Sequence, residues 1–150
     1  MNNNRKAFLD MIAWSEGTSK VKGSDNGYNV IVGGGLFQGY ADHPRKAINL
    51  PKLGIKSTAA GRYQLLSRYF DVYKEMLKLP DFSPASQDAI AIKQLKECHA
   101  LADIDEGRFE MAVHKCCRIW ASLPGAGYGQ HEHQLKDLEL AYLNAGGEIA

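Results

Sequence analysis

Apolar side chains recur at helical spacing through most of this chain, and the pattern is interrupted once, between Gly17 and Gly61. Phe8, Met11 and Ile12 lie at this spacing before the interruption. After Gly61 the same spacing returns and continues towards the C-terminus. The sequence therefore predicts a mainly helical body with one inserted segment of different structure.

The ends of the expected helices are marked by capping and breaking residues. The first helix is predicted to begin with Asn4 as its cap and to end at Glu16, where Gly17 stops it. A later one begins at Ser83-Pro84, because serine caps a helix well and proline is tolerated at its first position. The remaining helices are expected at 63–77, at 101–104, at 109–123 and at 135–142, the last ended by Gly146-Gly147.

The inserted segment is rich in turn-forming and β-forming residues. Two stretches that favour strands, 28–32 and 36–40, flank three glycines, which predicts a β-hairpin. Little regular structure is expected around Pro51 and Gly54. We therefore predict an α+β fold in a single domain, 1–150, with a β lobe at about 19–60 and a cleft between this lobe and the helical body.

Charge and composition exclude several classes of protein. The formal charge is +1, from 18 basic and 17 acidic residues that are interleaved without long blocks of either sign, so a nucleic-acid partner is not expected. No apolar stretch is long enough to span a bilayer, and the N-terminal residues do not form a signal-peptide core, so accumulation in the cytoplasm is expected. Cys98, Cys116 and Cys117 are an odd set without zinc-binding spacing and are interpreted as free thiols.

Glu16 is the candidate catalytic residue. It is placed at the C-terminal end of the first helix, where the backbone dipole disfavours a negative charge, and Trp14 nearby can exclude water. Both effects favour the protonated carboxyl group. Such an acid can protonate a leaving oxygen, for example in the cleavage of a glycosidic bond.

Two further motifs offer groups that suit a sugar ligand. Gln64 follows Gly61 at a predicted helix start and can both donate and accept a hydrogen bond. Tyr128 lies between two glycines in a loop, where an aromatic ring can stack on a sugar. Trp14 and Trp120 are candidates for lining the cleft, although aromatic side chains at helical spacing more often belong to the core.

Two histidines, His131 and His133, flank Glu132 at a predicted helix start. On a helix their side chains would diverge by roughly 200°. They are therefore interpreted as surface residues and not as metal ligands.

Taken in order, Ser15-Glu16-Gly17, Gly61-Arg62-Tyr63-Gln64 and Gly127-Tyr128-Gly129 resemble the three motifs of the lysozyme-like lytic transglycosylases. Longer runs, above all Trp120 to Gln130, are similar to the lambda-type phage endolysins, and this similarity covers about 4–147. The chain departs from the wider family pattern in having Gly17 after the glutamate, Tyr63 before the glutamine and no asparagine in the third motif. All three departures agree with the lambda-type branch.

The resemblance implies a lysozyme-like fold and cleavage of the bond between N-acetylmuramic acid and N-acetylglucosamine in peptidoglycan. Glu16 would act first as acid and then as base, giving a 1,6-anhydro product without metal or organic cofactor. Tyr63, Gln64 and Tyr128 would contact the substrate. The family also implies a monomer that waits in the host cytoplasm and reaches the periplasm through a membrane opened by a separate holin.

Two alternatives remain open at this point. Asp25 lies nine residues after Glu16, a spacing at which hydrolytic phage lysozymes carry a second carboxylate, although Asp25-Asn26-Gly27 is also a turn signal. Asn29 stands where the lambda-type relatives have an acidic residue, so that position need not supply the second carboxylate. The other alternative is a glycan-binding module without catalytic activity.

Overall fold

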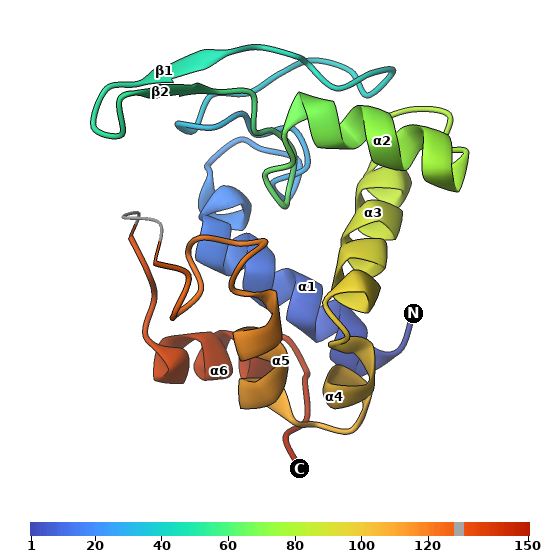
Figure 1. The fold of residues 1–150 in the computed structure, drawn as a ribbon, viewed down its shortest axis with the longest axis vertical. Helices are drawn as coiled ribbons and strands as arrows, with labels where there is room; N and C mark the ends of the chain where they lie inside the picture. Colours follow the sequence, from blue (N-terminus) through green and yellow to red (C-terminus); the bar gives the residue numbers. More distant parts are fainter. Residues whose placement is uncertain (128–130) are drawn as a thin grey trace. The chain divides into compact units, whose positions relative to one another are not determined.

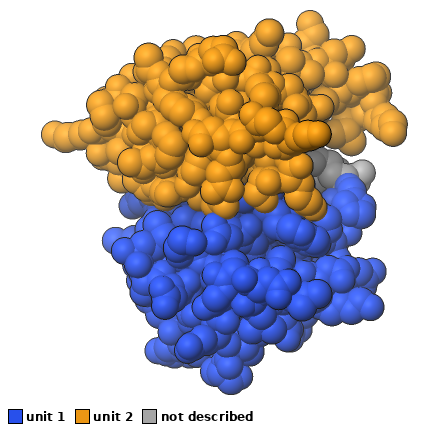
Figure 2. All heavy atoms as spheres, turned by 180° about the vertical axis from the view of Figure 1, so that it is seen from behind, with its two compact units in different colours: residues 1–16, 91–150 blue, residues 17–90 orange. Residues whose placement is uncertain are grey.

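The computed structural model describes residues 1–127 and 131–150, and it divides the chain into two compact units. Unit 1 contains Met1–Glu16 and Ala91–Ala150, whereas unit 2 contains Gly17–Ile90 (Figure 2). Unit 2 is therefore an insertion in unit 1, and the boundary near residue 90 falls inside helix α3 (Pro84–Glu97). No helix in the described part of the chain is both long and apolar enough to cross a lipid bilayer.

Unit 1 is built around helix α1 (Asn3–Glu16), whose apolar residues are buried on nearly all sides. Phe8 is fully buried and lies edge-on to Phe109 of α5 and Tyr142 of α6, with ring centroids 6.0 and 6.3 Å away. Figure 1 shows α1 with α4, α5 and α6. Their bounds are Leu101–Asp105 for α4, Phe109–Cys116 for α5 and Leu135–Asn144 for α6.

The first helix is capped by a different residue from the one expected. Asn2, not Asn4, accepts a hydrogen bond from the Arg5 N–H (2.9 Å). The Asn4 amide instead donates to the Ile104 carbonyl (2.9 Å) and accepts from the Glu148 N–H (3.0 Å). Asn4 therefore joins α1 to segments about 100 or more residues away in the chain.

Unit 2 contains the short 3-10 helix η1 (Thr18–Lys20), helix α2 (Ser67–Leu77) and one two-stranded antiparallel sheet. Strands β1 (Ile48–Leu50) and β2 (Ile55–Ser57) pair with Ile48 opposite Ser57 and Leu50 opposite Ile55. The core of this unit is a cluster of buried residues, Ile31, Phe37, Ala60, Leu65, Phe70, Phe82 and Ile90.

The hairpin predicted at 28–40 is wrong as a pair of strands. Val30 and Leu36 form only an isolated bridge, because Gly33 and Gly34 both have positive φ and turn the chain tightly. Ile31 instead bridges to Ala60. The strands that do form lie at 48–57, where Pro51 and Gly54 had suggested a loop and in fact belong to the turn.

Two predicted helices are shorter than expected. The helix expected at 63–77 begins only at Ser67, because Ala60 and Leu65 pair with each other across a tight loop. The helix expected at 109–123 ends at Cys116, and Trp120 and Leu123 are buried in the turns that follow. The fold class is nevertheless as predicted, with six α-helices in the described residues and a small sheet.

Gly61 begins the loop that replaces the first turn of the expected helix, and it provides a test of the packing in unit 2. Its φ is 85°, and a Cβ there would overlap the Gln87 side-chain oxygen and lie 2.8 Å from Phe82 Cζ. Gln87 cannot move freely, because its oxygen accepts from the Arg62 N–H (2.9 Å). We expect Gly61→Ala to lower the free energy of unfolding by about 2 kcal/mol more than a matched control, measured by denaturant titration.

The control for that experiment is Gly39→Ala. Gly39 has a similar φ of 79°, but a Cβ there would meet nothing within 4 Å. Gly39→Ala should lower the free energy of unfolding only by the backbone strain of an alanine with positive φ, about 1 kcal/mol. Equal losses in the two variants would show that crowding by Gln87 and Phe82 does not restrict residue 61.

Candidate functional site

Glu16 is the last residue of α1 and its side chain is only partly exposed. Gly17 follows with φ 80°, and this left-handed conformation lets the chain leave the helix at once. The carboxyl group is thus held at the end of a buried helix, as the sequence predicted. The last turn of the helix presents its carbonyl groups there, so the local potential is negative.

Burial raises the pKa of Glu16 to about 7, and a hydrogen bond with the Ser122 side chain opposes part of this rise. A carboxyl group with this pKa is protonated in a large fraction of molecules at neutral pH. It can therefore donate a proton at neutral pH and accept one again afterwards.

Ser15 and Ser122 form a pair of buried hydroxyl groups next to Glu16. Their Oγ atoms are 2.6 Å apart, and the two residues are separated by 107 positions in the sequence. Ser122 lies in the turns after α5, and we did not identify it from the sequence. Its importance comes from this distant contact, for which the sequence carries no local signal.

The prediction that His131 and His133 lie on a helix and diverge is wrong, whereas His131 is exposed, as expected of a surface residue. Helix α6 begins only at Leu135, so both histidines precede it, and their ring centroids are 4.8 Å apart. His133 also packs against Trp14, with ring centroids 4.7 Å apart, and its Nε2 lies 2.9 Å from the Ser15 carbonyl oxygen. His133 therefore belongs to the surroundings of Glu16.

The two tryptophans have different environments. Trp120 is only 2% exposed and belongs to the core of unit 1. Trp14 is partly exposed and contributes to a hollow of about 360 Å³, together with His133, Asp137, Leu140, Ala141 and Asn144. Of the two, only Trp14 is placed where a ligand could touch it.

Gln64 lies in the loop between Gly61 and α2 and not on a helix. It has a positive φ of 55°, and its side-chain nitrogen donates to the Gly61 carbonyl (2.9 Å) and to the Val30 carbonyl (3.4 Å). These contacts fix the plane of the amide. The amide oxygen is then the group that Gln64 can offer to a ligand.

Tyr63 is placed inside unit 2. It is 6% exposed, and its hydroxyl donates to Asp88 (2.6 Å) and accepts from Arg62 (3.1 Å). Tyr28 donates to the same carboxylate (3.0 Å). Tyr63 thus supports the loop that carries Gln64, and its contact with a substrate stays a prediction.

Tyr128 lies outside the described residues, but the loop before it is held by a contact that the sequence did not predict. The Glu132 carboxylate accepts hydrogen bonds from the backbone N–H groups of Gly125 and Gly127, both at 3.0 Å. These bonds lower the pKa of Glu132. Glu132 therefore fixes the backbone at Gly125 and Gly127.

Asp25 has the contacts of a turn residue. Its carboxylate accepts a hydrogen bond from the Tyr40 hydroxyl (2.6 Å), and its backbone N–H donates to the side chain of Asn29 (2.8 Å). Burial, followed by the contact with Asp25, raises the pKa of Tyr40. Asp25 is thus held within unit 2 by its own neighbours.

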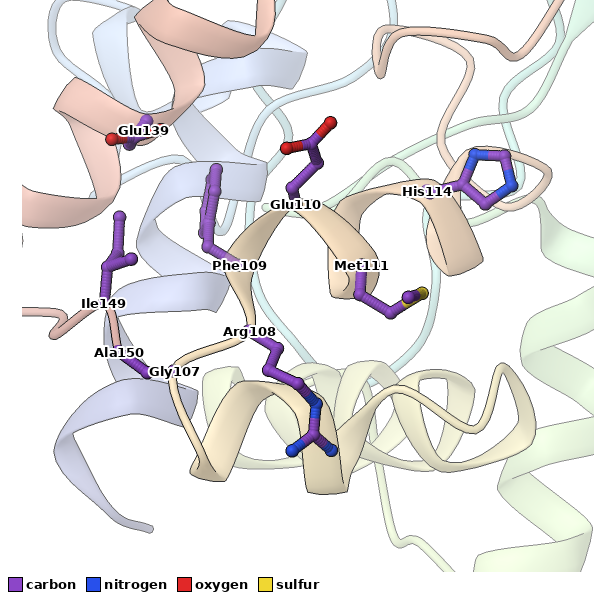
Figure 3. Close-up of a pocket in the computed structure, with 9 residues that line it drawn as sticks. All are labelled: Gly107, Arg108, Phe109, Glu110, Met111, His114, Glu139, Ile149 and Ala150. Atoms are coloured by element: carbon purple, nitrogen blue, oxygen red, sulfur yellow. The ribbon is translucent and has the colours of Figure 1, made fainter.

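A second hollow in unit 1 does not include these residues. It has a volume of about 610 Å³ and is lined mainly by α5 and the C-terminal residues, including Phe109, Met111, His114 and Ile149 (Figure 3). Neither Glu16 nor its partners Ser15, Ser122 and His133 line it. We therefore do not assign it to the candidate site.

Comparison with known proteins gives consistent matches over the whole chain. A family model described as "Endolysin" matches residues 6–149. The chain is 58% identical to an endolysin of Escherichia phage lambda, over 99% of this chain and 95% of that protein. It is 50% identical to an endolysin of Escherichia phage P2, over 96% of this chain and 93% of that protein.

Solved structures agree with this result. Bacteriophage lambda lysozyme complexed with a chitohexasaccharide matches with a TM-score of 0.96 and 56% identity, covering 100% of this chain and 98% of that one. A second structure of lysozyme from bacteriophage lambda matches with a TM-score of 0.92 and the same identity and coverage. The fold predicted from the sequence, α+β and lysozyme-like, is confirmed.

Proposed function

The chain belongs to the endolysin family of lysozyme-type cell-wall enzymes, and we propose that it is a lytic transglycosylase whose single catalytic carboxyl is Glu16. The observation that carries this proposal is the burial of the Glu16 carboxyl group at the end of α1, beside Ser122, which raises its pKa to about 7. The substrate is the bond between N-acetylmuramic acid and N-acetylglucosamine in peptidoglycan. The chitohexasaccharide bound by the lambda lysozyme, a related glycan, supports this class of substrate.

In the first step, protonated Glu16 gives its proton to the oxygen that joins the two sugars. The bond from this oxygen to C1 of the muramic acid breaks, and N-acetylglucosamine leaves with a free 4-hydroxyl. Positive charge develops at C1, and Glu16 becomes a carboxylate. The high pKa of Glu16 favours this proton transfer, because a large fraction of the protein carries the protonated carboxyl group at neutral pH.

In the second step, the Glu16 carboxylate removes the proton from the C6 hydroxyl of the same muramic acid. The C6 oxygen then bonds to C1 and forms the 1,6-anhydro ring. Glu16 is protonated again, so the cycle closes without consuming water. A group with a pKa of about 7 suits both steps, because neither of its protonation states is strongly favoured at neutral pH.

The other predicted contacts have supporting roles in this proposal. Gln64 would accept a hydrogen bond from a sugar hydroxyl or acetamido N–H through its amide oxygen, while Tyr63 and Tyr128 would complete the contacts with the glycan. The two units would act as one catalytic domain, 1–150. The reaction needs no metal or organic cofactor.

Asp25 is the candidate second carboxylate of a hydrolytic mechanism, and its contacts favour a structural role. Its hydrogen bond from Tyr40 and its place in a turn account for the residue without catalysis. A glycan-binding module without activity is also less well supported, because such a module has no need of a carboxyl group with a pKa of about 7.

The products of peptidoglycan digestion distinguish these possibilities. We expect the purified protein to release muropeptides with 1,6-anhydro ends, lighter by one water than reducing ends, as measured by mass spectrometry. Reducing ends alone would contradict transglycosylation, and their loss in Asp25→Asn would assign that carboxylate to hydrolysis. Binding to peptidoglycan without release of fragments would instead support the binding module.

In the infected cell, we propose that the protein acts as a monomer after leaving the host cytoplasm for the periplasm. A separate holin would open the inner membrane for it. The similarity to endolysins of the phages lambda and P2 supports this route.

A further inference from the structure

We propose that His133 is a positioning residue for Glu16, which fixes the last turn of α1 to the segment that carries Ser122. This inference rests on the proposed role of Glu16 as the acid and base of the reaction. His133 would not touch the substrate. It would keep the Glu16 carboxyl and its hydroxyl partner in the arrangement that proton transfer requires.

The first contact joins His133 to the end of α1. Its Nε2 lies 2.9 Å from the carbonyl oxygen of Ser15, the residue before Glu16. A carbonyl oxygen only accepts hydrogen bonds, so Nε2 must carry the proton in this contact. The last carbonyl groups of a helix have no donor within the helix, and His133 supplies one from outside.

The second contact joins the same residue to the partner of Glu16. The backbone N–H of His133 donates to the carbonyl oxygen of Ser122 (2.9 Å). The side-chain oxygens of Ser15 and Ser122 are 2.6 Å apart and complete a closed ring of three contacts. Glu16 is attached to this ring twice, through the peptide bond to Ser15 and through the hydrogen bond with the Ser122 side chain.

The ring of His133 is itself held in place. It packs on Trp14 at 4.7 Å and against His131 at 4.8 Å, measured between ring centroids. Asp137 lines the same hollow, while the adjacent Glu132 accepts hydrogen bonds from the backbone N–H groups of Gly125 and Gly127. The imidazolium form also carries a proton on Nε2, so the contact with Ser15 persists in either charge state.

Two substitutions of His133 separate the effect of its hydrogen bond to Ser15 from the effect of removing the imidazole ring. The amide nitrogen of glutamine reaches about as far as Nε2, whereas that of asparagine reaches only as far as Nδ1. We expect His133→Asn to lower kcat by about 10-fold or more on soluble peptidoglycan fragments, because small displacements of a catalytic group are costly. His133→Gln should remain within about 3-fold of the unchanged protein, and KM should change by less than about 3-fold in both.

The pH profile provides a readout that a loss of stability alone would not change. The alkaline limb of kcat/KM reports the pKa of Glu16 in the free enzyme. Burial is the main cause of the raised pKa, so loosening the end of α1 in His133→Asn should move this limb to lower pH. Ser122→Ala should move it to higher pH, because the hydrogen bond from Ser122 lowers the pKa of Glu16.

His114→Asn is the control, because His114 is an exposed histidine of α5 in the same unit and belongs neither to the ring of contacts nor to the aromatic contacts of His133. It should retain the kcat and pH profile of the unchanged protein.

The proposal is overturned if His133→Asn keeps its kcat, if His133→Gln and His133→Asn lose activity equally, or if only the melting temperature of His133→Asn changes. An unchanged alkaline limb in Ser122→Ala would also overturn it, even if His133→Asn does not fold. These outcomes concern rates, so they are independent of whether the products carry anhydro or reducing ends.

Discussion

Replacing Glu16 by glutamine should reduce the turnover of peptidoglycan on the order of 10²–10⁴-fold. Glutamine has nearly the same shape and can still bond to Ser122, but it has no acidic proton for the leaving oxygen. The loss should appear in kcat, because proton transfer is needed in the transition state more than in binding. The rate of release of soluble muropeptides under steady-state conditions measures it.

The control for this experiment is Glu139→Gln, which removes an exposed carboxylate from α6 in the same unit. It should leave the turnover unchanged. If Glu16→Gln retains near-normal turnover, Glu16 is not the acid, and the assignment of the catalytic residue fails. Retained binding of the Glu16→Gln variant to peptidoglycan would show that the loss arises in the chemical step.

The same substitution should stabilise the folded protein at alkaline pH. The pKa of Glu16 is about 7 in the folded protein and 4.5 in its ordinary state, so the folded state holds this proton more tightly. Glu16 therefore makes its full contribution to stability below about pH 4.5 and loses it as the pH rises through about 7. The difference of roughly 2.5 pKa units corresponds to about 3 kcal/mol.

Glutamine carries no charge at any pH, so it avoids this penalty. We expect the free energy of unfolding of Glu16→Gln to exceed that of the unchanged protein by up to about 3 kcal/mol at pH 8. The two proteins should differ little at pH 4. Denaturant titrations at both pH values test this, and Glu139→Gln should show no difference that depends on pH. A constant difference between Glu16→Gln and the unchanged protein would contradict the raised pKa.

The sequence predicts best those elements whose signals are local. Helix α3 begins at Pro84 after Ser83, as expected, and the Ser83 hydroxyl accepts from the Ser86 N–H (3.3 Å). Helix α6 begins at Leu135 and ends shortly before Gly146, also as expected. In both cases the residues that start or stop the helix lie within a few positions of its ends.

The errors arise where tertiary contacts override the local pattern. Tyr63 has the spacing of a helical residue, but its hydroxyl is bound to Asp88, and the bridge between Ala60 and Leu65 keeps the chain out of a helix there. The residues of strand β2 do not alternate between buried and exposed positions, so the strand has no recognisable sequence pattern. Ile55, its one large apolar residue, is 49% exposed. No window of neighbouring residues contains this information.

The candidate site divides in the same way. The position of Glu16 at a helix end can be predicted from the sequence, and the structure has it at the end of α1, while its catalytic role stays a proposal. Ser122 and His133 were not identified, because their partner Ser15 lies 107 and 118 positions away in the sequence. A residue that acts by holding another residue leaves no spacing pattern, so only a structure reveals it.

Unit 1 is assembled from both ends of the chain, and this has a consequence for the time at which activity can arise during synthesis. Helix α1 carries Glu16 but packs against α6, and its Asn4 is bound to the backbone of Glu148. While the ribosome is still translating the middle of the message, α1 has emerged without the partners that bury it. We therefore expect the environment that raises the pKa of Glu16 to form only after α6 has left the ribosome, so that a nascent chain without α6 carries a glutamate of ordinary acidity.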